Sequence, residues 1–439
     1  MSEDIITLLY NSFNPFQPLP AGDPKYVDCR EVRGNTDIIE DLGNRIRISD
    51  DNTCHLYSGH RGGGKSTELR RLKKYLEENN FFVIYFEADE EDIQSEDAQY
   101  TDILLACTRH LLADLYKIAN PNKLLNWVNS RVKELKDIAQ TELYLEGLSV
   151  EAQIAQVAKI TANLRAEPNM RQEIRDKVNP HTVSLIDILN EYLKEAKEKL
   201  PNNCNKLAMI VDNLDRIVPI IQESGRTNHE EIFIDRFQQL QALDCHLIYT
   251  VPISLLYSHR ANDIQANYND AIILPMVMVR TPDDNKYDDG LDKIQQLIGK
   301  RFGKIAPKLS LETEIFHSKD TLRQMCLMSG GHIRDLMHLM QNAISGSSSL
   351  PITKTTVRKS ISKLRDVYRR SVNEQQWELL AEIYRYKRII NDNKYRDLLF
   401  NRCLLEYCYW DEEYELKRWC DVHPLIRGIP EFKEAVARL

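Results

Sequence analysis

The sequence LYSGHRGGGKSTELRR, residues 56–71, places four glycines, a lysine and two hydroxyl side chains between an apolar run and a helix-like run. Its centre, Gly59-His60-Arg61-Gly62-Gly63-Gly64-Lys65-Ser66, satisfies the pattern G-x-x-x-x-G-K-[ST]. Residues 53–59 are expected to form a buried strand and residues 66–78 a helix. This strand–loop–helix context is the one in which such a loop binds phosphate, so a phosphate site is predicted here.

The residue types of the loop explain why it would hold phosphate. Glycines allow successive backbone N–H groups to turn inward, and the helix that begins near Lys65 adds its positive end. Lys65 is expected to reach the outer phosphates, and the hydroxyl of Ser66 to bind Mg²⁺. The predicted ligands are ATP and Mg²⁺. The predicted contacts from this stretch are Gly59, His60, Arg61, Gly62, Gly63, Gly64, Lys65, Ser66 and Thr67.

A second element supplies the carboxylate that a metal–phosphate site needs. The apolar run KLAMIVDNLD, residues 206–215, is expected to bring Asp212 to the carboxyl end of a strand, where α/β sheets bind their ligands. Asp212 is predicted to hold Mg²⁺ through water, and Asp215 to polarise a water molecule. The alternative explanation of both aspartates is an ordinary strand-end turn, because Asp and Asn are good turn formers.

The fold class follows from apolar runs separated by helical sequence. FFVIYFEA (81–88), CHLIYTVP (245–252) and AIILPMVMV (271–279) are further strand-like runs. Continuous apolar strands alternating with helices predict a parallel sheet covered on both faces. An α/β fold with a P-loop parallel-sheet core is therefore expected.

Composition shifts divide the chain into four parts. Residues 1–35 are rich in turn signals and are expected to form an extended arm, followed by an α/β core over 36–280 that contains a helical insertion at 121–200. Residues 281–348 are expected to form a helical lid that ends in a Gly-Ser linker. Residues 351–439 begin with a basic helix and end with two strand-like runs around the turn DEEYE (411–415), which is the outline of a winged helix.

Bulk properties exclude several classes of protein. The net charge of −8 over 439 residues provides no general basic field, so any contact with nucleic acid must come from a local patch. Neither a long apolar run nor a signal-peptide pattern is found, so a membrane span and secretion are not expected. The nine scattered cysteines suit reduced thiols, and a cytoplasmic location is expected.

The loop at 59–66 together with the VDNLDR element resembles the AAA+/STAND branch of P-loop ATPases, in particular its KAP-like forms, over residues 20–345. The resemblance implies that Thr250 senses the γ-phosphate and that Arg334 of the lid folds back over the nucleotide. It also implies that Tyr26 and Val27 line the adenine. A strand-end threonine and a solvated helix arginine are the simpler explanations of Thr250 and Arg334.

One residue departs from this family. Many AAA+ hydrolases have a glutamate base directly after the metal-binding aspartate, where this chain has Asn213. Either Asp215 then takes the role of the base or turnover is slow, which favours a switch over a motor. Arg236 matches the region where AAA+ rings carry an arginine that acts on a neighbouring subunit. Arg171 and Arg175 are competitors for that role, and a surface helix arginine is the commoner explanation.

Three functions are compatible with these residues. The first is an ATP-binding regulatory ATPase that acts as an oligomerising, nucleotide-dependent switch for a protein effector; the resemblance associates such switches with bacterial antiviral defence. The alternative is a DNA-associated AAA+ ATPase similar to initiators or transposition regulators, with residues 351–439 on the duplex. The basic helix at 354–370 favours DNA, whereas the acidic turn at 411–415 does not. A P-loop kinase is the third, and the helical lid argues against it.

Overall fold

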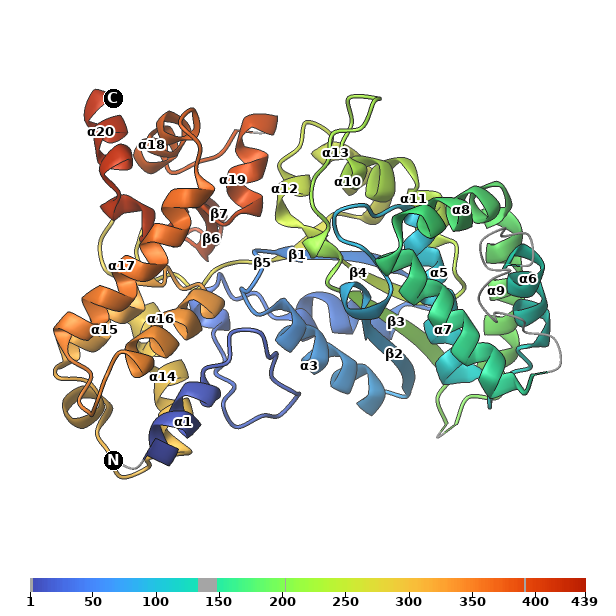
Figure 1. Ribbon diagram of the computed structural model, residues 1–439, viewed down its shortest axis with the longest axis horizontal. Coiled ribbons are helices and arrows are strands. Elements are labelled where there is room, and N and C mark those ends of the chain that lie inside the picture. The colour runs from blue at the N-terminus through green and yellow to red at the C-terminus, as the bar shows by residue number, and fades with distance from the viewer. Residues whose placement is uncertain (1–2, 133–147, 202, 391) are drawn as a thin grey trace.

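The computed structural model describes residues 3–132, 148–201, 203–390 and 392–439. A five-stranded sheet lies at the centre of the chain, with helices on both sides of it (Figure 1). Its strands are β1 (Cys54–Gly59), β2 (Phe81–Glu87), β3 (Lys206–Asp212), β4 (His246–Pro252) and β5 (Ala271–Leu274). The order is β2-β3-β4-β1-β5 and every pair is parallel, which confirms the predicted α/β fold class.

Both faces of the sheet are buried, as the apolar runs predict. Neighbouring residues of a strand point to opposite faces, so Val83 packs with α3 (Lys65–Glu78) and the helical segment 39–48, whereas Ile84 packs with α5 (Tyr100–Leu115). The shorter core helices include α2 (Asn44–Ile48), α4 (Ala88–Glu91), α10 (Asn228–Glu230), α11 (Phe237–Gln241), α12 (Ile253–Leu256) and α13 (Ala261–Tyr268).

The insertion between β2 and β3 contributes a helical layer on the α5 side of the sheet. It contains α6 (Asn122–Val132), α7 (Val150–Ala166), α8 (Pro168–Val178) and α9 (Thr182–Lys197). Residues 133–147 of this predicted segment lie outside the described residues. No described helix is long and apolar enough to cross a membrane.

The N-terminal arm differs from the expectation of an extended segment. Residues Glu3–Ser12 form α1, which packs against the lid helices α14 (Asp288–Gly303) and α16 (Ile333–Ser345). Leu9 and Phe13 are buried there, because the apolar side chains of this short helix gather on one face. Only the part after residue 12 runs as an irregular strap along the core.

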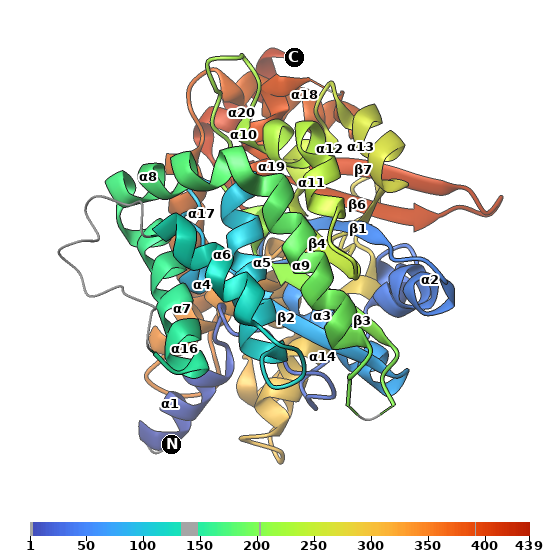
Figure 2. The ribbon, with the colours of Figure 1, turned by 90° about the vertical axis from the view of Figure 1, so that its right-hand side faces the viewer.

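The lid and the C-terminal region share one hydrophobic core. It joins α14, α15 (Lys319–Met328) and α16 to α17 (Lys354–Ser371), α18 (Gln376–Tyr386), α19 (Arg396–Phe400) and α20 (Pro430–Arg438). Strands β6 (Leu404–Trp410) and β7 (Leu416–Val422) form an antiparallel hairpin that projects to one side in Figure 2. The elements follow the predicted order, and the winged-helix assignment stays a prediction.

A glycine turn fixes the lid on the core. Gly330 and Gly331 join α15 to α16 with φ of 61° and 73°, in the left-handed region that favours glycine. A Cβ on Gly331 would lie 1.8 Å from the carbonyl oxygen of Val277. The turn therefore requires both the left-handed conformation and the absence of a side chain.

We expect Gly331→Ala to lower the free energy of unfolding by more than about 1 kcal/mol, because it combines a left-handed alanine with a backbone clash. Gly303→Ala is the matched control: it lies at the end of α14 with nothing within 4 Å of the new Cβ. Chemical denaturation of both variants checks this. Equal midpoints for Gly331→Ala and the parent would contradict it.

Candidate functional site

The predicted phosphate loop joins β1 to α3 at the carboxyl edge of the sheet. Gly59, Gly62 and Gly64 have φ of 143°, 86° and 113°. A Cβ on Gly62 would lie 2.6 Å from the Cβ of Arg334, so this position also needs glycine for the close approach of the lid. The loop therefore has the left-handed backbone positions that an anion-binding loop uses.

Lys65 is buried at the base of the loop with its ammonium group fully engaged. Its Nζ donates to the carbonyl oxygens of Gly59 (2.8 Å) and His60 (3.0 Å) and pairs with the Asp215 carboxylate at 2.9 Å. Lys65 and Asp215, predicted from separate motifs, thus meet in one place. Both line the same pocket, where a phosphate could take over part of the role of the carboxylate.

Ser66 and Asp212 are also brought together. The Ser66 hydroxyl lies close enough to the Asp212 carboxylate to lower its pKa, and this carboxylate accepts hydrogen bonds from the Tyr85 hydroxyl (2.8 Å) and the Asn213 N–H (2.7 Å). Burial, followed by the charge on Asp215, raises the pKa of Asp212. A nearby cation would counteract this effect.

These two side chains fit Mg²⁺ bound mainly through substrate oxygens and water. Among the described residues no group of three or more His, Cys, Asp or Glu side chains could hold a metal by itself. Mg²⁺ keeps several waters and uses one or two protein ligands beside phosphate oxygens, so one hydroxyl and one carboxylate suffice. Ser66 would bind the ion directly, and Asp212 through water.

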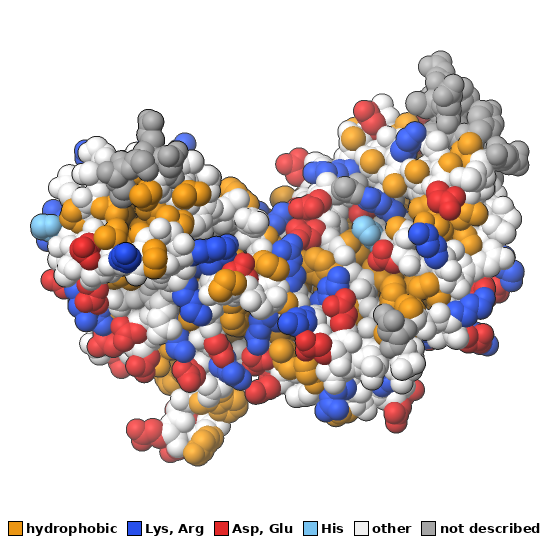
Figure 3. All heavy atoms as spheres, turned by 90° about the horizontal axis from the view of Figure 1, so that it is seen from below, with side chains coloured by type: hydrophobic (Ala, Val, Ile, Leu, Met, Phe, Trp, Pro, Cys, Tyr) orange, Lys and Arg blue, Asp and Glu red, His pale blue; other side chains and the backbone are white. Residues whose placement is uncertain are grey.

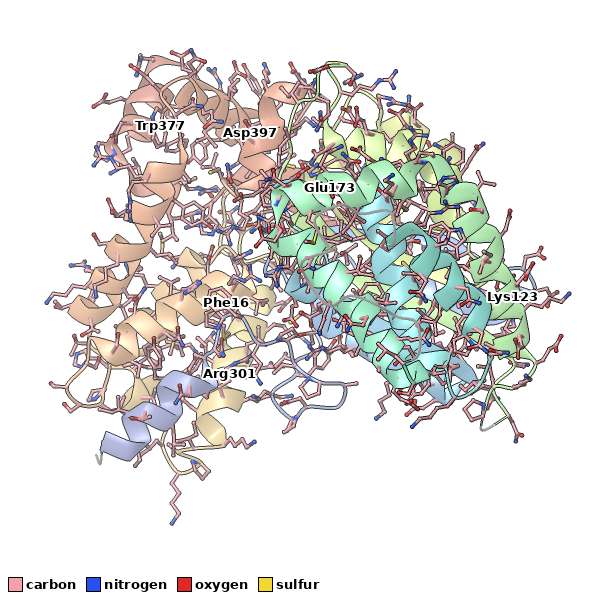
Figure 4. The ribbon with its side chains drawn as sticks, turned by 45° about the vertical axis from the view of Figure 1, so that its right-hand side comes forward. Phe16, Lys123, Glu173, Arg301, Trp377 and Asp397 are labelled. Atoms are coloured by element: carbon pink, nitrogen blue, oxygen red, sulfur yellow. The ribbon has the colours of Figure 1, made fainter. Side chains whose placement is uncertain are left out.

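A pocket of about 1000 Å³, including its open mouth, extends from the loop. The arm, the loop, the turn after β3 and the lid all contribute to its wall. Figure 4 shows Phe16 of the arm and Arg301 of α14 on the lid side of the molecule. Tyr26 and Val27 line the pocket together with Leu297 and Met337, so the predicted adenine-lining residues lie beside apolar lid side chains.

The charge of the pocket suits a polyanion. Its wall contains six basic side chains and two acidic ones, Glu68 and Asp215. The basic ones are Arg33, Arg61, Lys65, Arg216, Arg301 and Arg334. A concave site with this excess of positive charge raises the local concentration of anions such as a triphosphate.

Two lid arginines enter the pocket from different helices. Arg334, predicted from the sequence, donates to the carbonyl of Pro15 at 3.3 Å, and burial lowers its pKa to about 10. Arg301, which the sequence analysis missed, is also buried, which lowers its pKa to about 10, and it donates to the Leu297 carbonyl. No sequence pattern distinguishes Arg301, because a basic residue near the end of a helix is common.

Other predicted residues lie outside the pocket wall. Thr250 is buried, and its hydroxyl accepts from the Leu214 N–H at 2.9 Å, so it shapes the turn after β3 in this arrangement. Arg236 is exposed, with its guanidinium 5.0 Å from the Tyr100 ring centre, so it does not act on the pocket of its own chain. A role on a neighbouring subunit stays a prediction.

The competitors of Arg236 are excluded by burial. Arg171 and Arg175 are 4% and 1% exposed, and both pair with Asp97 at 2.6 and 2.9 Å. Arg175 also binds the buried Asp102 carboxylate. These arginines hold the helical insertion on α5 and cannot reach another subunit.

No protein-family model and no curated protein matches the chain. Solved structures with similar shape include Cdc6p from Pyrobaculum aerophilum, at 14% identity, 98% coverage of both chains and a TM-score of 0.40. The ORC2 protein of Aeropyrum pernix, in ADPNP–ADP complexes, matches at 9% identity with 98% coverage of both chains and a TM-score of 0.43. The ORC1 protein of the same organism, solved in complex with DNA, matches at 11% identity with a TM-score of 0.34. The match covers 93% of this chain and 94% of the ORC1 chain. At such low identities and TM-scores, no residue role passes from them to this chain.

The Lys65–Asp215 pair generates a prediction that separates binding from folding. Lys65→Met should abolish ATP binding, because the phosphates lose a buried cation. It should also cost about 1–3 kcal/mol of stability, because the Asp215 carboxylate is left without its partner. In Lys65→Met/Asp215→Asn the stability should return while binding stays lost. Calorimetric titration and denaturation check this, and ATP affinity unchanged by Lys65→Met would contradict it.

Proposed function

We propose that this chain is an ATP-binding ATPase in which the bound nucleotide controls how the lid and C-terminal region pack on the α/β core. The observation that carries the proposal is that the phosphate loop contacts both of these regions directly. The pocket supports nucleotide binding, and the loop contacts support a regulatory use of that binding.

The second and third residues of the loop make these contacts. The His60 ring accepts a hydrogen bond at Nε2 from the backbone N–H of Glu406 in β6, at 2.8 Å. The Arg61 guanidinium lies 4.9 Å from the ring centre of Phe400 in α19, and its carbonyl is 2.7 Å from Nε2 of His332 at the start of α16. A rearrangement of the loop on nucleotide binding would therefore disturb both interfaces.

The His60 contact is independent of pH in the neutral range. Burial is the main cause that keeps the pKa of His60 well below its usual value, and the charges of the nearby His332 and Lys65 add to it. The ring is therefore neutral, which its role as a hydrogen-bond acceptor requires. Nucleotide, rather than protonation, is the signal that this contact is suited to transmit.

Hydrolysis would use the groups gathered around the loop. Mg²⁺ bound at Ser66 and Asp212 would supply charge neutralisation for the phosphates. Lys65 would bind the outer phosphates, and its departure from Asp215 would free that carboxylate to accept a proton. Arg334 would close the pocket from the lid side. A homo-oligomer in which Arg236 reaches a neighbouring site is part of the proposal, although no contact between subunits bears on it.

A second candidate function is association with DNA through residues 351–439. Four basic side chains of α17 are exposed and form no ion pair within the described part of the chain: Lys354, Arg358, Lys359 and Lys363. The other three are engaged, since Arg365 donates to the Leu425 carbonyl, Arg369 pairs with Glu431 and Arg370 with Asp366.

The four free cations of α17 favour DNA over a protein effector as the partner of this region. Elsewhere, on the face seen in Figure 3, charges of both signs are interspersed. A role as an effector switch in antiviral defence stays a prediction from the family resemblance alone, and no described contact adds to it.

The coupling is tested by hydrogen exchange on the full chain without nucleotide, with ADP and with a non-hydrolysable ATP analogue. We expect protection of β6 and α19 to change with the nucleotide. His60→Ala should raise exchange in β6 without nucleotide and weaken that response, because the Glu406 N–H loses its partner. His259→Ala, at an exposed histidine, is the control. Identical exchange of β6 in all three states would refute the coupling.

DNA association is tested by the salt dependence of duplex binding. We expect Arg358→Ala/Lys359→Ala/Lys363→Ala to weaken binding and to reduce the slope of log affinity against log salt by about 1 for each phosphate that is no longer neutralised. Arg369→Ala/Arg370→Ala removes two arginines that are also exposed but are ion-paired, and it should have a smaller effect. Equal effects of the two variants, or no binding by the parent, would remove α17 as a DNA site.

A further inference from the structure

A second carboxylate ends the strand beside Asp212. Strands β2 and β3 pair in parallel register, which sets Glu87 opposite Asp212 at the carboxyl edge of the sheet. The Tyr85 hydroxyl lies between the two, 2.8 Å from Asp212 and 3.4 Å from Glu87. The sequence analysis passed over Glu87 as the polar end of an apolar run. Its place beside Asp212 becomes visible only once β2 is paired with β3.

Glu87 holds the side chain of Asn213. Its carboxylate, 13% exposed, accepts from Arg70 Nη2 at 2.9 Å and from Asn213 Nδ2 at 3.0 Å. A carboxylate only accepts hydrogen bonds, so it fixes which end of the amide faces it. Nδ2 of Asn213 must point to Glu87, and Oδ1 must point away from it.

The residue that carries this amide also borders the nucleotide pocket. Asn213 lines the pocket beside Asp215 and Lys65. Within the described residues no donor binds its Oδ1. An acceptor atom that points away from Glu87 therefore belongs to a residue of the pocket wall.

Asparagine suits this position for two physical reasons. Asn213 has φ of 67°, a left-handed conformation that asparagine adopts more readily than glutamate does. A glutamate at 213 would also bring its carboxylate against that of Glu87, where like charges repel. Asn213 and Glu87 are thus complementary, and the departure from the family pattern has a local cause.

We propose that Asn213 orients the attacking water through Oδ1 and that Glu87 is the positioning residue that sets the amide for this task. The inference rests on the proposed ATPase function and deepens it. It keeps the expectation that Asp215 takes the proton and adds a role for the amide at 213. An amide that orients water without taking its proton is a known solution in nucleotide hydrolysis.

The step balances with groups of this chain. The water oxygen forms a bond to Pγ while the bond between Pγ and the β–γ bridging oxygen breaks. ADP leaves with that electron pair, and the proton of the water passes to the Asp215 carboxylate. Asn213 accepts a hydrogen bond from the water throughout and is unchanged.

The key variant is Glu87→Gln, which keeps the shape of the side chain. Arg70 can only donate, so it would hold the single acceptor oxygen of the new amide and leave its NH₂ group facing Asn213. Asn213 would then turn its Oδ1 to that NH₂ group and present a donor to the pocket. The attacking water would lose its acceptor, while the groups that bind ATP would remain.

We expect Glu87→Gln to lower kcat at least about tenfold with ATP affinity and KM changed less than about twofold. Asn213→Ala should have a similar effect, and the double variant should be no slower than the slower single one, because Glu87 acts through Asn213. Asp92→Asn is the matched control: Asp92 is a buried, arginine-paired carboxylate near the end of β2 that does not contact Asn213. It should leave kcat unchanged.

The outcomes separate the inference from the proposed function. If the parent hydrolyses ATP and Glu87→Gln has the same kcat, the inference is refuted and the ATPase proposal stands. The same holds if the effects of the two single variants multiply in the double variant. ATP binding without any turnover by the parent would refute hydrolysis, and the inference with it. A decrease in Glu87→Gln matched by Asp92→Asn would assign Glu87 a structural role only.

Discussion

The site depends on the parallel alignment of three strands. Because β1, β2 and β3 all end at one edge of the sheet, Gly59, Glu87 and Asp212 are brought together from positions far apart in the chain. Buried apolar residues on both faces hold this register, and a slip by one residue would turn each strand end to the opposite face. The loop, the carboxylates and the hydroxyl of Ser66 are therefore positioned by the packing of the sheet rather than by their own interactions.

Electrostatics explains how such a site is stable without its ligand. The ammonium of Lys65 is compensated by Asp215 and two carbonyls, so the buried cation costs little to keep. The arginines around it are less well compensated. Burial lowers the pKa of Arg334, the charges of Arg402, Arg216 and Arg61 add to this effect, and the charge of Asp215 opposes it. A bound polyanion would compensate the charge of the arginines and would offer Lys65 an alternative partner.

The sequence predicted the parts of the site that follow from local pattern. The loop with its glycines and the strand that delivers Asp212 lie where strand and turn patterns place them. Tyr26 and Val27, which the family resemblance suggested, line the pocket, and their contact with adenine stays a prediction. Contacts between segments that are distant in the sequence could not be predicted from it. The family resemblance implied that Thr250 senses the γ-phosphate; its hydroxyl accepts from the Leu214 N–H, and the role at the phosphate stays a prediction. Glu87 was missed because the pairing of β2 with β3 cannot be read from either run alone. The helix at Glu3–Ser12 was missed because turn signals dominate the segment that follows it.

The shared core of the lid and C-terminal region decides how a nucleotide signal would travel. Two regions with separate cores could move independently, whereas one continuous core makes α14 to α20 and the hairpin behave as a single body. This body meets the loop at His60, Arg61 and Gly62, through hydrogen bonds from Glu406 and Arg334 and through the stacking of Phe400. Each of these contacts contributes little free energy compared with the hydrophobic core of this body. A change in the loop would therefore alter the contacts and leave the core of the body intact. The same body also packs on the α/β core, because Val277 and Val279 share its hydrophobic core and Met276 packs on the hairpin. The loop contacts are therefore the part of a larger interface through which bound phosphate would act.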